Sequence, residues 1–206
     1  TYDEMLEMAS LGAKVLHSRC VEIAKKYGVE LLVCSSLNRN SGTMVREKTK
    51  MEKMLISGVA ADKNVAKIRV AGLGNDPEST FRLLNLLDRN NLNIDVMIQS
   101  LGKDGTKSVS FTVAKPDMLR TIDVLNDNKD LLGIKKLDYD ENVAKVSVIG
   151  AGVRSHSGVA AKMFGALANA GINTEMVTTS EIRITALIDE AYADQAMRAI
   201  HETFLE

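Results

Sequence analysis

The chain has 206 residues, with 26 lysines and arginines against 27 aspartates and glutamates, so its formal net charge at pH 7 is −1. A near-neutral chain lacks the basic field that holds nucleic acid or an anionic membrane surface, and its apolar runs are too short to span a bilayer. These features argue against a nucleic-acid or membrane protein and predict a globular cytoplasmic protein of one large or two small domains.

The first part of the chain, residues 1–50, is expected to form two helices and a strand. Asp3 is predicted to cap the first helix and Ser18 the second, which stops at Tyr27-Gly28. The residues expected to face inward are Met5, Leu6, Met8, Ala9, Val21, Ile23 and Ala24. A buried strand is predicted at 29–35, and the polar stretch after it indicates an exposed connection and a domain boundary.

The two cysteines, Cys20 and Cys34, lack the C-x-x-C spacing of a metal site. We expect both to be buried free thiols in a reducing cytosol. The chain begins with Thr1 rather than Met, which suggests that it is a piece of a longer product.

The rest of the chain contains an internal repeat. Residues 66–70 (AKIRV) align with residues 144–148 (AKVSV), and Asn93 aligns with Asn173 after a two-residue slip. The expected elements are strands 66–73, 93–100, 107–114 and 132–139 with helices 77–90 and 116–127 in the first copy, and strands 144–150, 173–180 and 182–188 with helices 157–170 and 191–205 in the second. This order predicts an α+β protein with two ferredoxin-like βαββαβ domains.

The second copy ends before its last strand. Residues 54–60 are an unassigned strand candidate, and we expect them to fill that place, which would insert the first domain into the second. The predicted domains are therefore 66–140 for the first copy and 51–65 plus 141–206 for the second.

Each copy turns tightly from its first strand into a helix. In "GLGNDPEST" Asp76 takes the N-cap position and Pro77 the first helical position, and in "GAGVRSHSG" Ser155 or Ser157 caps a helix beside Gly158. Free amides and the positive end of a helix dipole suit a carboxylate or phosphate. An ordinary capped helix, without a ligand, is the alternative interpretation.

Polar residues alternate with aliphatic ones in the strand that follows each helix. The rows predicted to face away from the helices are Asn93, Asp95, Met97 and Gln99 in the first copy and Asn173, Glu175, Val177 and Thr179 in the second; the inward row is Ile94, Val96 and Ile98. These rows are either solvated or line a contact between repeats or chains. Such a contact could bind an amino acid, with helix amides for its carboxylate, strand carbonyls and Asn for its ammonium, and Asp95 or Glu181 for a basic side chain.

Both repeats resemble ACT domains, and "KVSVIGAGVRSHSGVAAKMFGALANAGINTEMVTTSEIRITALID" resembles the second ACT domain of the aspartokinase family. The stretch "YDEMLEMASLGAKVLHSRCVEIAKKYGVELLVCSSLNRNSGTMV" resembles the C-terminal end of that family's amino-acid-kinase domain, so the resemblance covers essentially the whole chain. It implies a feedback sensor for lysine, often with threonine, whose partners are the kinase catalytic domain and a second copy paired through ACT domains. ATP and magnesium would belong to the catalytic part, which leaves this chain without a cofactor, metal or catalytic residue.

Carried over by position, the resemblance implies two groups of effector contacts. They are Asn75, Asp76, Glu78, Thr80, Asn93, Asp95 and Gln99 in the first ACT domain, and Ser155, His156, Ser157, Gly158, Asn173, Thr174, Ser180 and Glu181 in the second. The first loop departs from the family's frequent Asp-Lys-Pro-Gly, because Glu78 narrows the space and adds negative charge. In the second loop Ser157 replaces a common proline, and Ala160 lacks the hydroxyl that some lysine-sensitive members have there.

Other functions are alternatives to that of a feedback sensor. The chain could be an amino-acid-sensing ACT module of another biosynthetic enzyme, or contain a separate small regulatory subunit that starts at Met51. An active phosphotransferase is disfavoured, because no nucleotide-binding glycine loop is present. An RNA-binding sheet is disfavoured, because strands 93–100 and 173–180 contain no aromatic residue. The three histidines, His17, His156 and His201, are far apart in the sequence and indicate structural or solvated roles.

Overall fold

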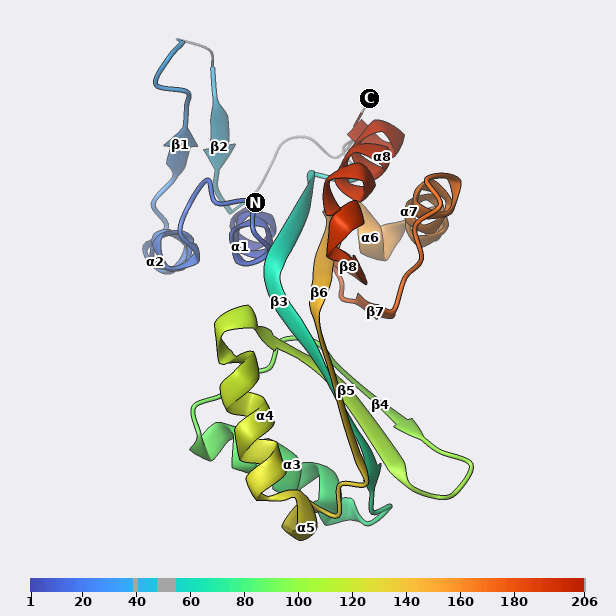
Figure 1. The fold of residues 1–206 in the computed structure, drawn as a ribbon. Helices are drawn as coiled ribbons and strands as arrows, with labels where there is room; N and C mark the ends of the chain where they lie inside the picture. The colour runs from blue at the N-terminus through green and yellow to red at the C-terminus, as the bar shows by residue number, and fades with distance from the viewer. Residues whose placement is uncertain (39–40, 48–54, 206) are drawn as a thin grey trace. The chain divides into compact units, whose positions relative to one another are not determined.

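The computed structural model describes residues 1–38, 41–47 and 55–205, which form an α+β fold with antiparallel strand pairing (Figure 1). The chain divides into two compact units: residues 1–62 together with 145–206 form one, and residues 63–144 form the other. No helix within the described ranges is both long and apolar enough to cross a membrane.

Residues 63–144 form the first ferredoxin-like domain. Its elements are the second half of β3 (Gly58–Leu73), α3 (Pro77–Arg89), β4 (Met97–Leu101), β5 (Lys107–Ala114), η1 (Lys115–Asp117), α4 (Met118–Asp127), α5 (Lys129–Leu132) and the first half of β6 (Lys136–Ile149). The strand order is β4-β5-β3-β6, and both helices α3 and α4 lie on one face of the sheet (Figure 1). This is the arrangement that the order of elements in the sequence predicts.

The core of the first domain follows from the two periodicities of its elements. In β5 every second residue from Val109 to Val113 is buried, and Phe111 lies opposite Ile68 of β3. In α3 the buried apolar residues Leu83 and Leu87 are four positions apart and therefore share the helix face that covers the strands. Strand and helix patterns thus bury the same apolar layer.

The second domain is built from both ends of its unit. Its elements are the first half of β3, the second half of β6, α6 (Gly152–Ser155), α7 (Gly158–Asn169), β7 (Met176–Thr179), β8 (Arg183–Asp189), η2 (Glu190–Tyr192) and α8 (Ala193–Leu205). The strand order is β3-β6-β8-β7, so β3 takes the place of the missing fourth strand. The Ser57 amide donates to the Ile149 carbonyl at 2.8 Å, and Ile56 is buried in this domain's core. The first domain is therefore inserted into the second; of the predicted segment 54–60, Met54 lies outside the described residues.

Two long strands replace four predicted ones. The predicted strands 132–139 and 144–150 are one continuous strand, β6, and no glycine or proline interrupts the sequence between Lys136 and Ile149. Leu132, predicted to begin a strand, instead ends the short helix α5, and Gly133 caps that helix in the left-handed conformation with φ 70°. Each half of β3 and of β6 belongs to a different unit, which is how the insertion is made.

The N-terminal segment forms α1 (Tyr2–Ser10), α2 (Ser18–Tyr27), β1 (Leu31–Val33) and β2 (Thr43–Val45). The predicted caps Asp3 and Ser18 are wrong by one or two positions. Thr1 caps α1, where its hydroxyl accepts from the Glu4 amide at 3.3 Å in a capping box, and His17 caps α2. Gly28 ends α2 with φ 65°, as the sequence predicts.

Burial in this segment is lower than predicted. Cys20 and Cys34 are exposed, and so are Ile23 and Leu32, which the apolar pattern placed inside. Leu32 is exposed because, among the described residues, β1 and β2 pair only with each other as a two-stranded sheet, which leaves one face of each strand open. The apolar core of this segment consists of Tyr2, Val21, Ala24 and Val45, while Leu11 and Glu4 are buried elsewhere in it.

Candidate functional site

The start of α3 already holds a carboxylate of this chain. Asp76, at the N-cap, accepts from the Glu78 amide at 3.0 Å, from the Ser79 hydroxyl, and from Arg82 at 3.1 Å. The ammonium of Lys107 donates to the Asp76 carbonyl at 2.8 Å. An anion at a helix N-terminus is stabilised by the free amides and the helix dipole. Here Asp76 itself takes that position.

This network makes the pH dependence of stability predictable. The Ser79 hydroxyl, followed by Arg82 and the Glu78 amide, lowers the pKa of Asp76 to about 2 from its usual 3.8. A carboxyl whose pKa is depressed by folding adds stability above its unfolded pKa, and that stability is lost as the pH falls through the folded pKa. Asp76→Asn should therefore flatten the curve of melting temperature against pH between about 4 and 2. An unchanged slope in that window would contradict the role of Asp76.

The structure separates the predicted contacts of the first domain into two groups. Thr80 donates to the Gln99 side chain at 2.7 Å, so Gln99 lies with the loop of Asn75, Asp76 and Glu78. The Asp95 amide donates to the carbonyl of Thr112, five residues along β5 from Lys107. Five residues of strand span about 17 Å, so Asp95, and Asn93 before it, lie well away from the loop.

The predicted faces of this strand are also corrected. Asn93 and Asp95 precede β4, which begins at Met97. Met97 lies opposite Phe111 and packs against the core, whereas Ile98 lies opposite Ser110 and is exposed. Val96 is buried and is hydrogen-bonded to Thr112 of β5 just before β4 begins, whereas the Met97 side chain packs against the core.

Two glycines set the shape of the second loop. The Gly152 amide donates to the Leu55 carbonyl at 2.8 Å, and a Cβ on Gly152 would lie 2.3 Å from that oxygen. A Cβ on Gly150 would lie 2.6 Å from the Ile56 Cα. Only glycine allows the β6–α6 turn to come this close to the backbone before β3.

The second loop and the turn after β7 are joined by an ion pair. Arg154 donates to Glu181 at 3.0 Å, and both side chains are mostly exposed. Ser155 and His156 are hydrogen-bonded to each other at 2.8 Å between Oγ and Nδ1. Ser157 occupies the N-cap position of α7, but its side chain makes no capping hydrogen bond, and Gly158 beside it is exposed. The start of α7 therefore differs from that of α3, which a side-chain carboxylate caps.

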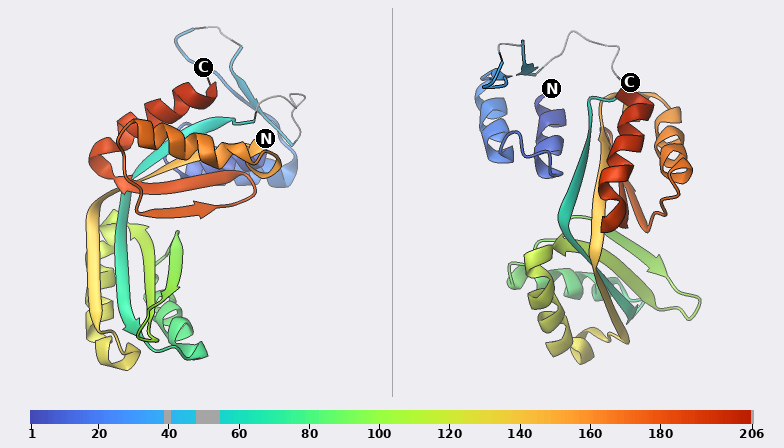
Figure 2. Two further views of the ribbon diagram at one scale, coloured as in Figure 1. Left: turned by 90° about the vertical axis from the view of Figure 1, so that its right-hand side faces the viewer. Right: turned by 45° about the horizontal axis from the view of Figure 1, so that its top comes forward.

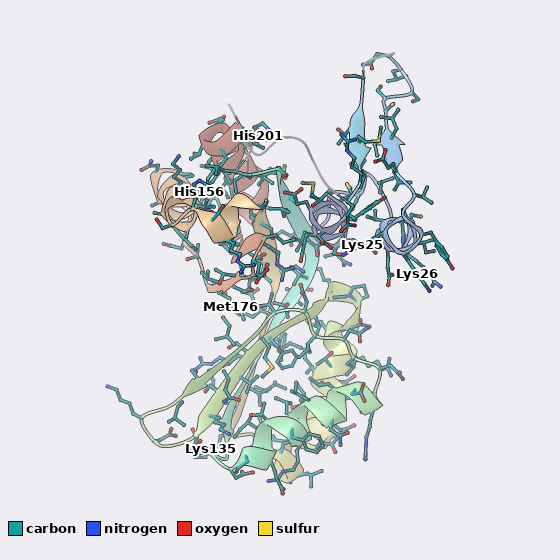
Figure 3. The ribbon with its side chains drawn as sticks, turned by 180° about the vertical axis from the view of Figure 1, so that it is seen from behind. Lys25, Lys26, Lys135, His156, Met176 and His201 are labelled. Carbon is teal, nitrogen blue, oxygen red and sulfur yellow. The ribbon has the colours of Figure 1, made fainter. Side chains whose placement is uncertain are left out.

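Asn173 and Thr174 do not lie with this group. The Glu175 amide donates to the Leu187 carbonyl, while the Ser180 amide donates to the Arg183 carbonyl. Four residues of β8 separate these two points, which is about 14 Å. Figure 3 shows the same separation, with Met176 at the start of β7 and His156 at the loop before α7. Val177 lies opposite Ala186, a residue of the helix-covered core, so it is on the helix side of the sheet and not on the opposite face as predicted, although its side chain is exposed.

Several residues of the site lie outside the sequence prediction. The sequence prediction does not include Arg82, Lys107 or Arg154. Arg154 lies within the predicted loop 150–158, where its positive charge is a usable signal for an anion site. Arg183 was missed too, and it donates to Glu7 of α1 at 2.9 Å. A contact across 176 positions leaves no pattern in a single sequence.

The grouped residues suit recognition rather than bond-making chemistry. The amides of the α7 start and Arg154 can receive a carboxylate, and Glu181 can receive an ammonium group. In the described part of the chain, no group of three or more His, Cys, Asp and Glu side chains is placed to hold a metal ion. The arrangement therefore fits a small zwitterion such as an amino acid.

Comparison with known proteins gives a consistent result. A family model described as "ACT domain" matches residues 146–204. The aspartokinase of Pseudomonas aeruginosa is 41% identical over 207 residues, covering 99% of this chain and 50% of that protein. The chain thus spans about half the length of the curated relatives it matches.

Two solved structures extend the match to the fold. The ligand-free regulatory subunit of aspartate kinase from Thermus thermophilus has a TM-score of 0.69 at 33% identity, covering 73% of this chain and 99% of that one. Aspartokinase III of E. coli in complex with lysine and aspartate has a TM-score of 0.76 at 25% identity, covering 100% of this chain and 45% of that one. The chain belongs to the aspartokinase family, and it contains that family's regulatory ACT-domain region.

Proposed function

We propose that this chain is the feedback-sensing region of an aspartokinase. In this proposal lysine, alone or with threonine, binds the ACT domains and controls the phosphorylation of aspartate by ATP in the catalytic part of the enzyme, within lysine, threonine and methionine biosynthesis. The observation that carries it is the Arg154–Glu181 pair, which joins the start of α7 to the turn after β7. The lysine complex of the similar E. coli enzyme supports lysine as the first candidate.

The second domain is the better candidate for the effector's carboxylate. At α3 the first-turn amide of Glu78 is already bonded to Asp76, whereas Ser157 leaves the start of α7 without a side-chain cap. The Arg154–Glu181 pair is exposed, and exposed ion pairs contribute little free energy. A bound lysine can therefore exchange with it, its carboxylate near Arg154 and its side-chain ammonium on Glu181.

We further propose that the effector binds where ACT domains of two copies pair. β4 and β7 are the outer strands of the described sheet order, and outer strands carry unpaired backbone groups. Exposed apolar side chains on them are Ile98, Leu101 and Val177. Light scattering with and without lysine tests this; a monomer under both conditions would contradict pairing.

A separate small regulatory subunit is the second candidate. The similar Thermus thermophilus chain is named a regulatory subunit, and it matches 73% of this chain. The internal start proposed for such a subunit, Met51, lies outside the described residues. Expression of the natural gene, followed by mass analysis of its products, distinguishes one long product from a long and a short one.

Calorimetric titration with lysine, threonine and both tests the main proposal. A ligand at 100 times its dissociation constant raises the free energy of unfolding by about 2.7 kcal/mol, so a thermal melt checks the same binding independently. Binding of either amino acid supports the sensor. No heat and no shift in melting temperature with either would count against it.

The choice of carboxylate gives a sharper prediction. Glu181→Gln should weaken the binding of lysine about tenfold or more, because the side-chain ammonium of lysine loses a charged partner. The affinity for threonine should remain nearly unchanged, because threonine has no such ammonium group. Asp95→Asn is the matched change in the first domain, where the sequence placed the alternative carboxylate. If Asp95→Asn gives the lysine-specific loss and Glu181→Gln does not, the site lies in the first domain instead.

A further inference from the structure

Helix α1 is bonded to the second domain by two carboxylates. Glu4, only 7% exposed, accepts through one oxygen from the Ser57 hydroxyl at 2.6 Å and from the Ala151 amide at 3.2 Å. Glu7 accepts from Arg183 at 2.9 Å, and both of those side chains are largely buried. Each carboxylate thus bonds to a different part of the second domain, far away in sequence.

Close contacts surround these bonds. A Cβ on Gly12 would lie 2.3 Å from the Ala61 carbonyl oxygen, and one on Gly58 would lie 2.8 Å from the end of the Met8 side chain. Leu11 is buried with Ala60 and Ile149. Figure 2 shows α1 on the opposite side of β3 from α7 and α8. Helix α1 therefore packs closely behind the sheet of the second domain.

The two bonded positions are the ends of the candidate effector site. Ala151 begins the loop that runs through Arg154 to Gly158, and Arg183 comes two residues after Glu181. The Ala151 amide donates to an ionisable carboxylate that is only 7% exposed, and the 2.6 Å bond from the Ser57 hydroxyl fixes the same oxygen. The hydrogen bond to Glu4 thus stabilises the position of the amide of Ala151, which is the first residue of the loop.

We propose that Glu4 is a positioning residue, which holds the loop 151–158 in its binding conformation from α1, the helix that resembles the end of the kinase domain. This inference rests on the proposed function for its consequence. Because coupling between two sites is reciprocal, an effector that binds the loop in this conformation must also strengthen the bond between the loop and α1. Glu4 would then be the first contact between the sensor and the catalytic part.

Three variants of the whole chain test this. Glu4→Met keeps the length of the side chain and removes its acceptors. Glu4→Gln keeps one oxygen that can accept from Ser57 and Ala151, so it should restore the wild-type behaviour. Asp3→Asn, an exposed carboxylate on the same helix, is the matched control.

Hydrogen exchange of the ligand-free chain is the first readout. Glu4→Met should speed exchange of the amides at 151–158 about tenfold, as expected for the loss of a hydrogen bond to a charged group. Glu4→Gln and Asp3→Asn should leave it within about twofold of wild type. Equal exchange in all four proteins would overturn the proposal. So would a uniform rise across the chain in Glu4→Met, which indicates general destabilisation.

Lysine titration of the same proteins is the second readout. Glu4→Met should weaken lysine about tenfold while Glu4→Gln retains its affinity, a pattern that a purely structural loss does not give. Unchanged lysine affinity in Glu4→Met would overturn the positioning role. If wild type binds no lysine, the proposed function fails, and the exchange data still decide whether Glu4 holds the loop.

Discussion

Replacing Gly152 with alanine should lower the free energy of unfolding by about 3 kcal/mol, as overpacking and a lost hydrogen bond together predict. The new Cβ would lie 2.3 Å from the Leu55 oxygen and 2.6 Å from its Cα, so two backbone segments must separate and the Gly152–Leu55 hydrogen bond is lost. That turn leads into the proposed effector loop, so under the proposed function lysine binding should fall in the same variant. Urea denaturation and calorimetric titration measure the two effects.

Gly158→Ala is the control for this change. It lies in the same loop, its Cβ would meet nothing within 4 Å, and it opens α7, where alanine is favourable. Its stability should stay within about 0.5 kcal/mol of wild type. If both alanine variants are equally stable, then the close approach of the turn to Leu55 is not what the loop requires.

Replacing Phe111 with alanine should lower the free energy of unfolding by about 3–5 kcal/mol, the usual loss for a buried aromatic residue. Phe111 is 1% exposed and lies between Ile68 and Met97 in neighbouring strands. The loss should be concentrated in residues 63–144, because that unit has its own core. Hydrogen exchange resolved by segment measures it, with the amides of α7 and α8 expected to keep their protection.

Phe81→Ala is the matched control on α3. Phe81 is 66% exposed, so its loss should change stability by no more than about 0.5 kcal/mol. Equal loss of protection in both domains of the Phe111→Ala protein would show that they unfold as a single cooperative unit, against the division into two.

The order of elements could be predicted because each has a strong local signal. Pro77 after Asp76 marks the start of α3, and Gly28 marks the end of α2. The alternation of Val109, Phe111 and Val113 marks a strand with one buried face. Strand ends were less predictable: β4 and β7 begin several residues after Asn93 and Asn173, because entry into a ladder depends on the partner strand.

The candidate site was only partly predictable for the same reason. The Arg154–Glu181 ion pair joins the loop 155–158 to the turn at Ser180 and Glu181, two segments that the family resemblance grouped together. Asn93 and Asp95 have the right residue types but lie at the other end of their strand. Burial also failed where few elements pack together, so Cys20 and Cys34 are exposed in spite of their apolar neighbours.

The sequence by itself determined the repeat, the βαββαβ order, the two glycine turns and the need for a strand from outside the second copy. These features depend on contacts between near neighbours in the chain, which leave periodic patterns. Only the tertiary structure decided that Lys107 bonds to Asp76, that Arg154 meets Glu181, and that Glu4 holds Ala151. Each of those contacts joins side chains or backbone groups of separate elements at hydrogen-bond distance. Such elements come together only when the chain folds, so the contacts leave no local pattern in the sequence.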